Sequence, residues 1–274
     1  MKGQGLKAIA LHMALGLVTL LTVAPLVWMV SASLMRSGEA SSYPPPWWPS
    51  APTLDHYRAL LTQGGLGRQF FNSLGLAIAA TLLSTTFNTL AGYAFAKLRF
   101  KGRDAIFAAL IGALVIPGQV AMLPLFLMLK GMGLVNSYVG VLVPSLAGIF
   151  GIFLVRQYAR GIPDELIEAA RIDGAGEFRI FFSIVLPLLK PVLATLAVFA
   201  FLGSWNDFMW PLIVLTDGEL HTLPVALASL SREHVQDSEL MMAGAVITVL
   251  PVLGLFLMLQ RYYLQGLTLG GVKQ

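Results

Sequence analysis

The chain has 274 residues, of which 57% are hydrophobic and only 12% are charged. A soluble domain typically carries about 25% charged residues, so this composition excludes an ordinary soluble protein and indicates an integral membrane protein. The chain has no cysteine and four scattered histidines, which excludes a disulfide framework and gives no metal-ligand spacing. The net charge of +4 is small, and the absence of any Gly-Lys dipeptide excludes a Walker A phosphate loop.

Six apolar runs are long enough to cross a hydrocarbon core of about 30 Å, which requires about 20 helical residues. They cover approximately residues 9–33, 70–96, 105–129, 138–155, 184–210 and 240–260. The sequence therefore predicts an all-α integral membrane protein with six transmembrane helices. We expect kinks or span ends at the prolines of the third and fifth runs, which are Pro117 (followed by Gly118), Pro124, Pro187, Pro191 and Pro211.

The first run has features of a cleaved signal peptide, because Lys2 and Lys7 precede it and the small residues 31–33 follow it. However, the uncharged stretch from Ala8 to Met35 is much longer than the roughly 7–15 apolar residues of a signal peptide. We therefore expect a retained first span.

The loop that follows, residues 36–69, contains the segment Tyr43-Pro44-Pro45-Pro46-Trp47-Trp48-Pro49. Consecutive prolines make a segment stiff and extended, and tryptophan favours the boundary between membrane and water. The segment is interpreted either as a docking surface for an external protein or as an interfacial anchor.

Residues 163–187, PDELIEAARIDGAGEFRIFFSIVLP, form a polar island between the fourth and fifth runs. Pro163 suits the first position of a helix, and Asp164 and Glu165 oppose the positive end of the helix dipole. Gly174 can adopt the left-handed conformation that ends a helix. A helix of about 11 residues is marginal alone in water, so we expect the membrane face or another protein to hold it.

Two interpretations of this short helix differ in what it contacts. It can lie in the lipid headgroup region, with Ile162, Leu166, Ala169 and Ala170 facing lipid. Helices at membrane surfaces favour polar faces rich in Lys and Arg, whereas this helix begins with acidic residues. We therefore favour contact with another protein.

The distribution of Lys and Arg predicts the orientation, since cytoplasmic loops carry an excess of these residues. With a cytoplasmic N-terminus, thirteen of the 18 lie on or near the inner side: Lys2, Lys7, Lys97, Arg99, Lys101, Arg103, Arg156, Arg160, Arg171, Arg179, Lys190, Arg261 and Lys273. The outer side then holds Arg36, Arg58, Arg68, Lys130 and Arg232. Both termini are therefore expected in the cytoplasm.

Within the fifth span lie only Lys190, near the inner surface, and Asp207, near the outer end; the other spans carry no Asp, Glu, Lys or Arg. Ion-coupled carriers usually hold ionisable groups at depth, so this pattern disfavours that class. Amide groups and aromatic faces suit a hydroxyl-rich solute such as a sugar, whereas the same groups also form hydrogen bonds between helices. The candidates for a solute pathway are Asn88, Gln119, Ser145, Trp205, Asn206 and Asp207.

The polar island resembles the EAA loop of permeases in binding-protein-dependent ABC importers. The residues that carry the resemblance are Glu168, Ala169, Ala170, Asp173, Gly174, Leu186 and Pro187. In that family this segment is a cytoplasmic coupling helix, here about residues 163–174, which sits in a cleft of the ATP-binding subunit. The resemblance thus implies the transmembrane domain of a type I ABC importer and a coupling role for these residues.

Other segments are similar to the carbohydrate-uptake branch of that family, specifically to the smaller permease of maltose-type systems. They are Asn72-Ser73, residues 91–98, Trp205-Asn206-Asp207 and residues 265–273. The resemblance divides the chain into a first span with its external loop (1–69), the importer domain (70–265) and a cytoplasmic tail (266–274). In the small permease, the outer loop at about residues 216–238 approaches the cleft of the binding protein, and the tail touches the ATPase.

The resemblance also implies the partners and the location. It predicts a heterodimer with a second permease, two ATP-binding subunits and an extracytoplasmic solute-binding protein, all at the bacterial cytoplasmic membrane. ATP and Mg²⁺ would be bound by the partner ATPase, so no cofactor, metal site or catalytic residue is expected in this chain, and no nucleic-acid partner. In maltose-type systems the sugar pocket lies mainly in the other permease.

We therefore expect a permease subunit that translocates a sugar or oligosaccharide. One alternative is the same machinery with another solute, such as glycerol phosphate, a polyol or an amino acid. An ion-coupled carrier and a purely structural membrane partner are alternatives from other classes.

Overall fold

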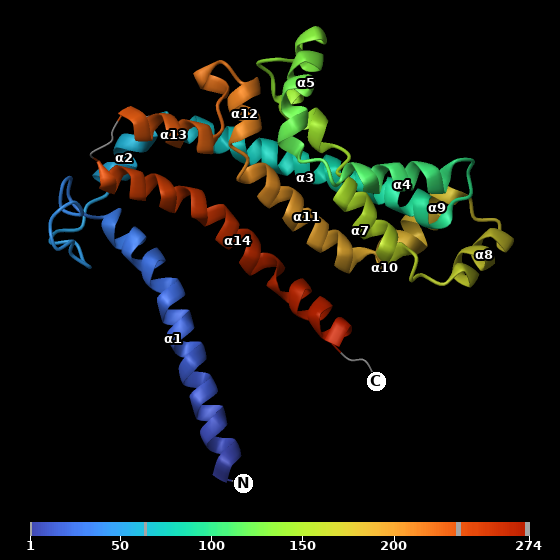
Figure 1. Cartoon of the computed structure of the whole chain (residues 1–274), viewed down its shortest axis with the longest axis horizontal. Coiled ribbons are helices and arrows are strands. Elements are labelled where there is room, and N and C mark those ends of the chain that lie inside the picture. The colour runs from blue at the N-terminus through green and yellow to red at the C-terminus, as the bar shows by residue number, and fades with distance from the viewer. Residues whose placement is uncertain (1, 63–64, 234–236, 272–274) are drawn as a thin grey trace. The chain divides into compact units, whose positions relative to one another are not determined.

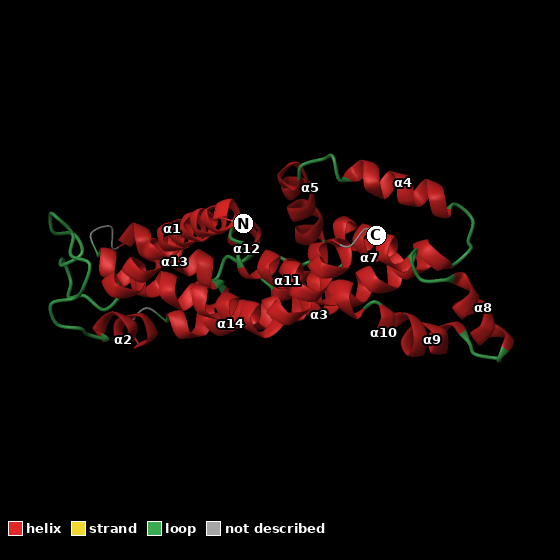
Figure 2. Cartoon of the chain, turned by 90° about the horizontal axis from the view of Figure 1, so that it is seen from below, coloured by secondary structure: helices red, strands yellow, loops and turns green. Residues whose placement is uncertain are grey.

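The computed structural model describes residues 2–62, 65–233 and 237–271, and every regular element in these ranges is a helix (Figure 2). This confirms the predicted all-α class. The long helices are α1 (Lys2–Ala32), α3 (Leu66–Lys97) and α14 (Ser238–Gly271) (Figure 1). The shorter ones, in chain order, are α2 (Asp55–Thr62), α4 (Arg103–Ala113), α5 (Gly118–Gly131), α6 (Tyr138–Leu142), η1 (Val143–Ser145), α7 (Ile149–Ala159), α8 (Asp164–Ile172), α9 (Glu177–Ile180), η2 (Phe181–Val185), α10 (Leu186–Leu188), α11 (Lys190–Trp205), α12 (Met209–Val214), η3 (Gly218–Leu220) and α13 (Leu223–Glu233).

Each predicted span has a counterpart in these helices. Three unbroken segments have the length and apolar character of a membrane span: Ile9–Ala32, Leu66–Lys97 and Ser238–Met258. The other three counterparts are bent pairs: Arg103–Ala113 with Gly118–Gly131 at 107°, Tyr138–Ser145 with Ile149–Ala159 at 41°, and Glu177–Leu188 with Lys190–Trp205 at 81°. The chain has six spans if each bent pair crosses the membrane once.

Proline explains two of the three breaks. A proline has no N–H and its ring clashes with the preceding turn, so it starts a helix more readily than it continues one. Pro117 is the N-cap of α5, and Pro191 lies in the first turn of α11. The predicted kinks at these two positions are confirmed, whereas Pro124 lies inside α5 and does not end it.

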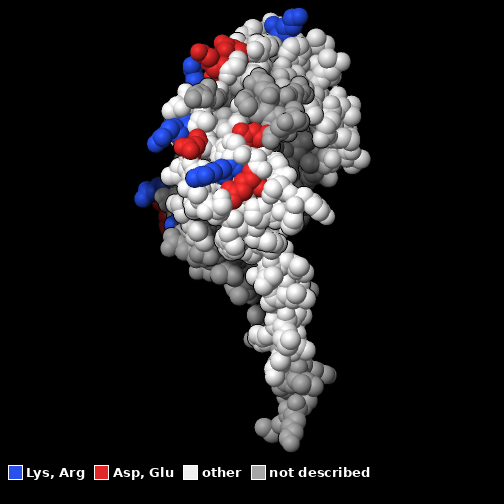
Figure 3. Space-filling view, turned by 90° about the vertical axis from the view of Figure 1, so that its left-hand side faces the viewer, with Lys and Arg blue, Asp and Glu red and all other residues white. Residues whose placement is uncertain are grey.

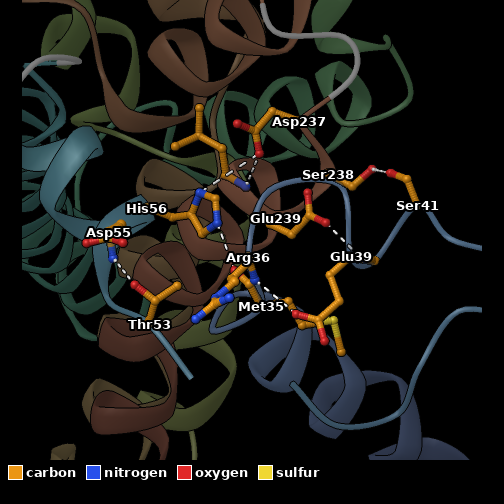
Figure 4. Close-up of polar contacts among 12 residues, drawn as sticks. Met35, Arg36, Glu39, Ser41, Thr53, Asp55, His56, Asp237, Ser238 and Glu239 are labelled. Atoms are coloured by element: carbon orange, nitrogen blue, oxygen red, sulfur yellow. Dashed lines mark hydrogen bonds and ion pairs between the residues drawn. The ribbon is translucent and has the colours of Figure 1, made fainter. Parts of the chain in front are cut away.

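The chain forms two compact units, the first of which contains residues 1–67 and 226–251. In it the loop between α1 and α2 is tied to the start of α14 (Figure 4). The buried Glu239 carboxylate accepts a hydrogen bond from the Ala40 backbone N–H at 2.6 Å. His56 is also buried, and its Nε2 donates to the Met35 carbonyl at 2.9 Å. These bonds fix the loop although most of it has no regular structure.

The proline- and tryptophan-rich segment is held against the end of α1. The Trp28 indole N–H donates to the Pro46 carbonyl at 3.1 Å, and the Ser31 hydroxyl donates to the Trp47 carbonyl. The side chains of Trp47 and Trp48 remain exposed. Between Ile9 and Ala32, α1 carries no charged side chain, and most of its apolar side chains are exposed, as expected for a helix that faces lipid or another chain (Figure 3).

The second unit contains residues 68–225 and 252–274, and it has two apolar clusters. The first is built from the C-terminal part of α3 and from α7 to α11, and includes Tyr93, Val155, Ile167 and Val185. Gly92 allows α3 and α7 to approach closely, because a Cβ there would lie 2.6 Å from the Val155 Cβ. The second cluster joins α3, α5, α6 and α12 around Trp210.

The predicted tail is helical where it is described, since α14 continues to Gly271. Residues 272–274 of that tail and residues 234–236 of the predicted outer loop lie outside the described residues.

Candidate functional site

The polar island folds as the short helix α8, close to the predicted bounds. Asp164 and Glu165 occupy its first turn and Arg171 its last turn, so all three oppose the helix dipole favourably. Pro163, however, is the N-cap, with ψ of 133°, and not the first helical residue as predicted. The helical backbone therefore begins one residue later, at Asp164.

The C-terminus of α8 is a Schellman motif. Gly174 has φ of +80°, its N–H donates to the Arg171 carbonyl at 3.0 Å, and the Ala175 N–H donates to the Ala170 carbonyl at 2.9 Å. The predicted glycine stop is confirmed. No heavy atom lies within 4 Å of the position that a Cβ would take at Gly174, so the glycine is required by backbone conformation and not by space.

One face of α8 is held by the chain itself. Ile167 and Ala170 are buried in the first apolar cluster, next to Ile162. Ile172 lies on the opposite side and is 86% exposed, whereas Leu166, one turn before Ala170, borders the buried face and is 47% exposed. The expectation that only the membrane or another protein could hold this short helix is therefore wrong, because its own unit anchors it.

The same contacts divide the set of residues proposed to face lipid. Ile162 and Ala170 are buried, whereas Leu166 and Ala169 are exposed. These four residues do not form one continuous apolar surface.

Lys97, the last residue of α3, tethers the start of α8. Its side chain is only 5% exposed, and its ammonium donates to the Ile162 carbonyl at 2.6 Å and to the Asp164 carboxylate at 2.5 Å. The hydrogen bond from Lys97, together with its charge, lowers the pKa of the Asp164 carboxyl below its usual value. Asp164 is therefore ionised at neutral pH and holds the N-terminus of α8 on α3.

A second polar link follows the helix. The Arg171 Nε donates to Glu177 at 2.7 Å, and the Tyr93 hydroxyl donates to the other Glu177 oxygen at 3.3 Å. Arg171 on α8 and Tyr93 on α3 are thereby joined through the first residue of α9.

Between α8 and the end of α3 lies a groove of about 740 Å³ with charges of both signs. Its charged lining residues are Lys97, Arg99, Arg103, Asp164, Glu168, Arg171 and Glu177. Within the part of the chain that the structure describes, Glu168 makes no hydrogen bond or ion pair. Its exposed carboxylate is therefore available to a cation of another molecule.

Leu186 and Pro187, the last residues of the motif, lie at the bend between α10 and α11. The π-helical turn η2 precedes them, and Val185 and Leu189 on either side are fully buried in the first cluster. Leu186 packs partly against that cluster, whereas Pro187 is exposed. The helix α8, this bend and the start of α11 therefore share one apolar cluster.

A second candidate site is a cavity of about 290 Å³ inside the same unit, lined by α3, α6, η1, α11 and α12. Two predicted pathway residues, Ser145 and Asp207, line it. Asn88 lies behind the wall, and its amide donates to the lining Ser84 hydroxyl at 2.9 Å. Among the described residues, neither its buried Oδ1 nor the buried hydroxyl of Thr222, which also lines the cavity, has a hydrogen-bond partner.

The other predicted pathway residues do not line this cavity. Trp205 is buried and stacks on Phe201 with ring centroids 5.8 Å apart. Asn206 is the exposed C-cap of α11, and Gln119 is exposed on α5. Sequence reasoning missed Ser84, Ser204 and Thr222, although the spacing of Ser84 and Asn88, four residues apart on one helix, indicates a shared face.

The segment after α12 is fixed to its own unit by amide side chains. The Asn136 Oδ1 accepts hydrogen bonds from the Thr216 and Asp217 N–H groups, both at 3.0 Å. The Asn72 amide donates to the carbonyls of Glu219 and His221 at 2.9 and 3.0 Å. The described start of the predicted outer loop is thus a fixed surface.

Comparison with known proteins identifies the family of the chain. Residues 88–268 match the family described as binding-protein-dependent transport system inner membrane component. The arabinooligosaccharides transport system permease protein AraQ of Halalkalibacterium halodurans is 41% identical over 93% of each chain. The melibiose/raffinose/stachyose import permease protein MelC of Bacillus subtilis is 36% identical over 91% of each chain. The lactose transport system permease protein LacG of Rhizobium radiobacter is 31% identical over 96% of this chain and 95% of LacG.

A solved structure has the same fold. A chain of a bacterial ABC transporter involved in the import of the acidic polysaccharide alginate superposes with a TM-score of 0.85, over 96% of this chain and 98% of that chain, at 22% identity. The predicted type I importer fold is confirmed by this match.

Proposed function

The chain belongs to the family of binding-protein-dependent transport system inner membrane components, and we propose that it is the permease subunit of an ATP-driven importer of a sugar or oligosaccharide. The observation that carries the proposal is the division of α8 into two faces. One face is buried in the chain's own core, and the opposite face presents Ile172 and the carboxylate of Glu168, which makes no hydrogen bond or ion pair among the described residues.

This division suits a coupling helix. A mechanical link must be attached firmly to the membrane domain and must also leave a specific surface free for its partner. Ile167, Ala170 and the Lys97–Asp164 pair provide the attachment, and Glu168 provides the specific contact. An ATP-binding subunit that docks on this face would move α8 and, through the shared apolar cluster, the bend at Leu186 and Pro187.

The proposal also specifies the partners of the chain and its orientation in the membrane. The chain forms a heterodimer with a second permease, joined by two ATP-binding subunits that bind ATP and Mg²⁺ and by an extracytoplasmic solute-binding protein. Both termini and α8 are cytoplasmic, in line with the Lys and Arg distribution. This chain performs no covalent chemistry. Its role is to change conformation during transport and to line part of the path of the solute.

A sugar is the proposed solute because the curated relatives AraQ, MelC and LacG are named for the transport of carbohydrates. The 290 Å³ cavity is compatible with such a solute, since it combines the hydroxyls of Ser84, Ser145 and Thr222 with apolar walls. Hydroxyls donate and accept hydrogen bonds, and apolar side chains pack on the ring face of a sugar.

The direct test is the energy source of uptake. The chain is co-purified with its partner subunits and reconstituted with the solute-binding protein, and uptake of that protein's sugar is followed. We expect uptake to require ATP and to survive collapse of ion gradients. Uptake that stops when gradients collapse while ATP is present would identify an ion-coupled carrier, and uptake unchanged by deletion of the chain would identify a structural partner.

Reporter fusions test the orientation separately. Fusions near residues 100, 170 and 270 are expected to report the cytoplasm, and fusions near 50, 133 and 225 the outside. An external report at residue 170 would remove α8 from the reach of an ATPase.

A further inference from the structure

A group of cationic side chains lies where three helices of the second unit end or begin. Arg99 and Lys101 are in the five-residue loop between α3 and α4, Arg103 is the first residue of α4, and Arg160 directly follows α7. Arg99, Lys101 and Arg160 are exposed, and Arg103 is half-buried. We call these four residues the basic cluster.

Most of this positive charge is not neutralised within the described chain. The side chains of Arg99, Lys101 and Arg160 make no hydrogen bond or ion pair among the described residues. Arg103 pairs with Asp104 at 3.1 Å and donates to the Leu98 carbonyl at 3.3 Å. The nearby acid Asp164 is engaged by Lys97, so the cluster keeps a net positive charge.

The cluster lies at the depth of lipid headgroups. A candidate span ends at Lys97, and the next bent pair begins at Arg103. The loop that joins them has only five residues, so it stays close to the membrane surface. Phe100, in the same loop, is 42% exposed. An exposed aromatic ring beside cations at a span end is typical of the membrane interface. Beside it is a hollow of about 380 Å³ lined by Arg99, Phe100, Gly102, Arg103, Asp104 and Ala105.

We propose that the basic cluster binds the phosphate of an anionic phospholipid in the inner leaflet. Arginine matches the geometry of phosphate oxygens, and clusters of Lys and Arg next to a span attract anionic headgroups. The α8 groove shares Arg99 and Arg103 with the cluster but adds the carboxylates of Asp164, Glu168 and Glu177, whereas Lys101 and Arg160 do not line it. The inference rests on the proposed orientation, which places the basic cluster on the cytoplasmic side.

The test uses native mass spectrometry on the complex purified with its partner subunits and titrated with phosphatidylglycerol or phosphatidylcholine. The variant is Lys101→Gln/Arg160→Gln, which leaves the residues of the α8 groove unchanged. The matched control is Arg36→Gln/Arg58→Gln, which removes two exposed cations from the first unit. Each cation near an anionic membrane contributes about fivefold in affinity, so the variant is expected to bind phosphatidylglycerol about 30-fold more weakly. The control is expected to bind as the wild type does.

Three results would overturn the proposal. They are equal binding of phosphatidylglycerol by the variant and the wild type, displacement of the lipid by millimolar inorganic phosphate, and loss of the ATP-binding subunit from the variant with lipid binding retained. The last would make the cluster a protein-docking surface. ATP-driven uptake by the wild-type complex in phosphatidylcholine vesicles tests the proposed function independently of these results.

Discussion

The α8 groove and the interior cavity lie in the same unit but present polar groups in opposite ways. In the groove the polar groups are charged and mostly exposed; Lys97 pairs with Asp164 and Arg171 with Glu177, whereas Glu168 and Arg99 make no ion pair among the described residues. In the cavity they are hydroxyls and one carboxylate among apolar side chains, and the Thr222 hydroxyl has no hydrogen-bond partner in the described part of the chain. Burial of a charge is costly unless it is paired, so a path through the membrane interior relies on sparse neutral groups. This difference supports our proposal that the groove serves recognition by another protein and the cavity serves a neutral solute.

Reversal of the Glu168 charge is expected to impair the function of the groove more than any other change. Loss of one partner of a buried interfacial charge pair typically costs about 2–5 kcal/mol. We therefore expect Glu168→Lys to weaken binding of the ATP-binding subunit at least about 30-fold, or to uncouple ATP hydrolysis from uptake. Co-purification of that subunit and uptake rates provide the measurement. Glu168→Gln, which removes the charge but keeps the shape, should fall between the wild type and the Lys variant; wild-type coupling in both would show that this carboxylate meets no cation.

Gly174→Val tests the geometry of the groove without changing its charge. Left-handed backbone costs a non-glycine residue about 1–3 kcal/mol, and a β-branched residue is especially strained. We expect the Gly174→Val protein to insert normally in the membrane but to lose uptake, because the strained turn changes the direction in which the chain leaves α8. Gly176→Val is the matched control, since Gly176 has φ of −73° and open space around its Cβ position. If the two variants transport equally well, the left-handed stop has no part in coupling.

Lys97→Met should loosen the attachment of α8 while leaving its free face intact. The change removes the donor to the Ile162 carbonyl, and a buried carbonyl left without a partner costs about 1–3 kcal/mol. Hydrogen exchange of the amides in α8 should accelerate accordingly. Unchanged exchange would show that the apolar contacts of Ile167 and Ala170 alone fix the helix.

The same attachment has a defined pH dependence. The pKa of Asp164 is lowered in the folded protein, so its ion pair stabilises the fold above the ordinary carboxyl pKa of about 3.9 and is lost as the pH falls through the lowered value. Protection of α8 should therefore be constant between about pH 7 and 5 and should fall only below about pH 4. In Lys97→Met this acid-dependent loss should disappear, and a loss of the same size in that variant would assign it to another group.

Changes in the cavity are expected to have the smallest effects. Ser145→Ala and Thr222→Val each remove one hydrogen-bonding group, worth about 0.5–1.5 kcal/mol. We expect each variant to raise the KM for uptake about two- to tenfold with little change in maximal rate. Thr86→Val, an exposed position on α3, is the control. Equal KM values in all three variants would mean that the cavity hydroxyls only join helices.

The helix that borders the groove could largely be predicted from the sequence, because the residues that start and end it act locally. Acidic residues at the start of α8 and Gly174 at its end act within one helical turn, and the structure confirms both. Its anchoring was not predicted, because the contact between Lys97 and Asp164 joins residues 67 positions apart and depends on tertiary packing.

The cavity was predicted less well. The identity of a polar residue does not reveal which face of a helix it occupies in a span that is apolar on all sides. Asn206 and Gln119 therefore lie on the surface, and Trp205 fills the core. The break before α7 was also missed, since no proline marks the residues between Ser145 and Ile149.

The central claim is that the free face of α8 contacts an ATP-binding subunit. Because the chain has no cysteine, Leu166→Cys places a single photo-crosslinker at an exposed position of α8, and Trp48→Cys places one on the loop between α1 and α2. In the assembled complex we predict a cross-link to the ATP-binding subunit from residue 166 and none from residue 48. Failure of residue 166 to cross-link to that subunit, in a complex that hydrolyses ATP and transports its sugar, would contradict the account.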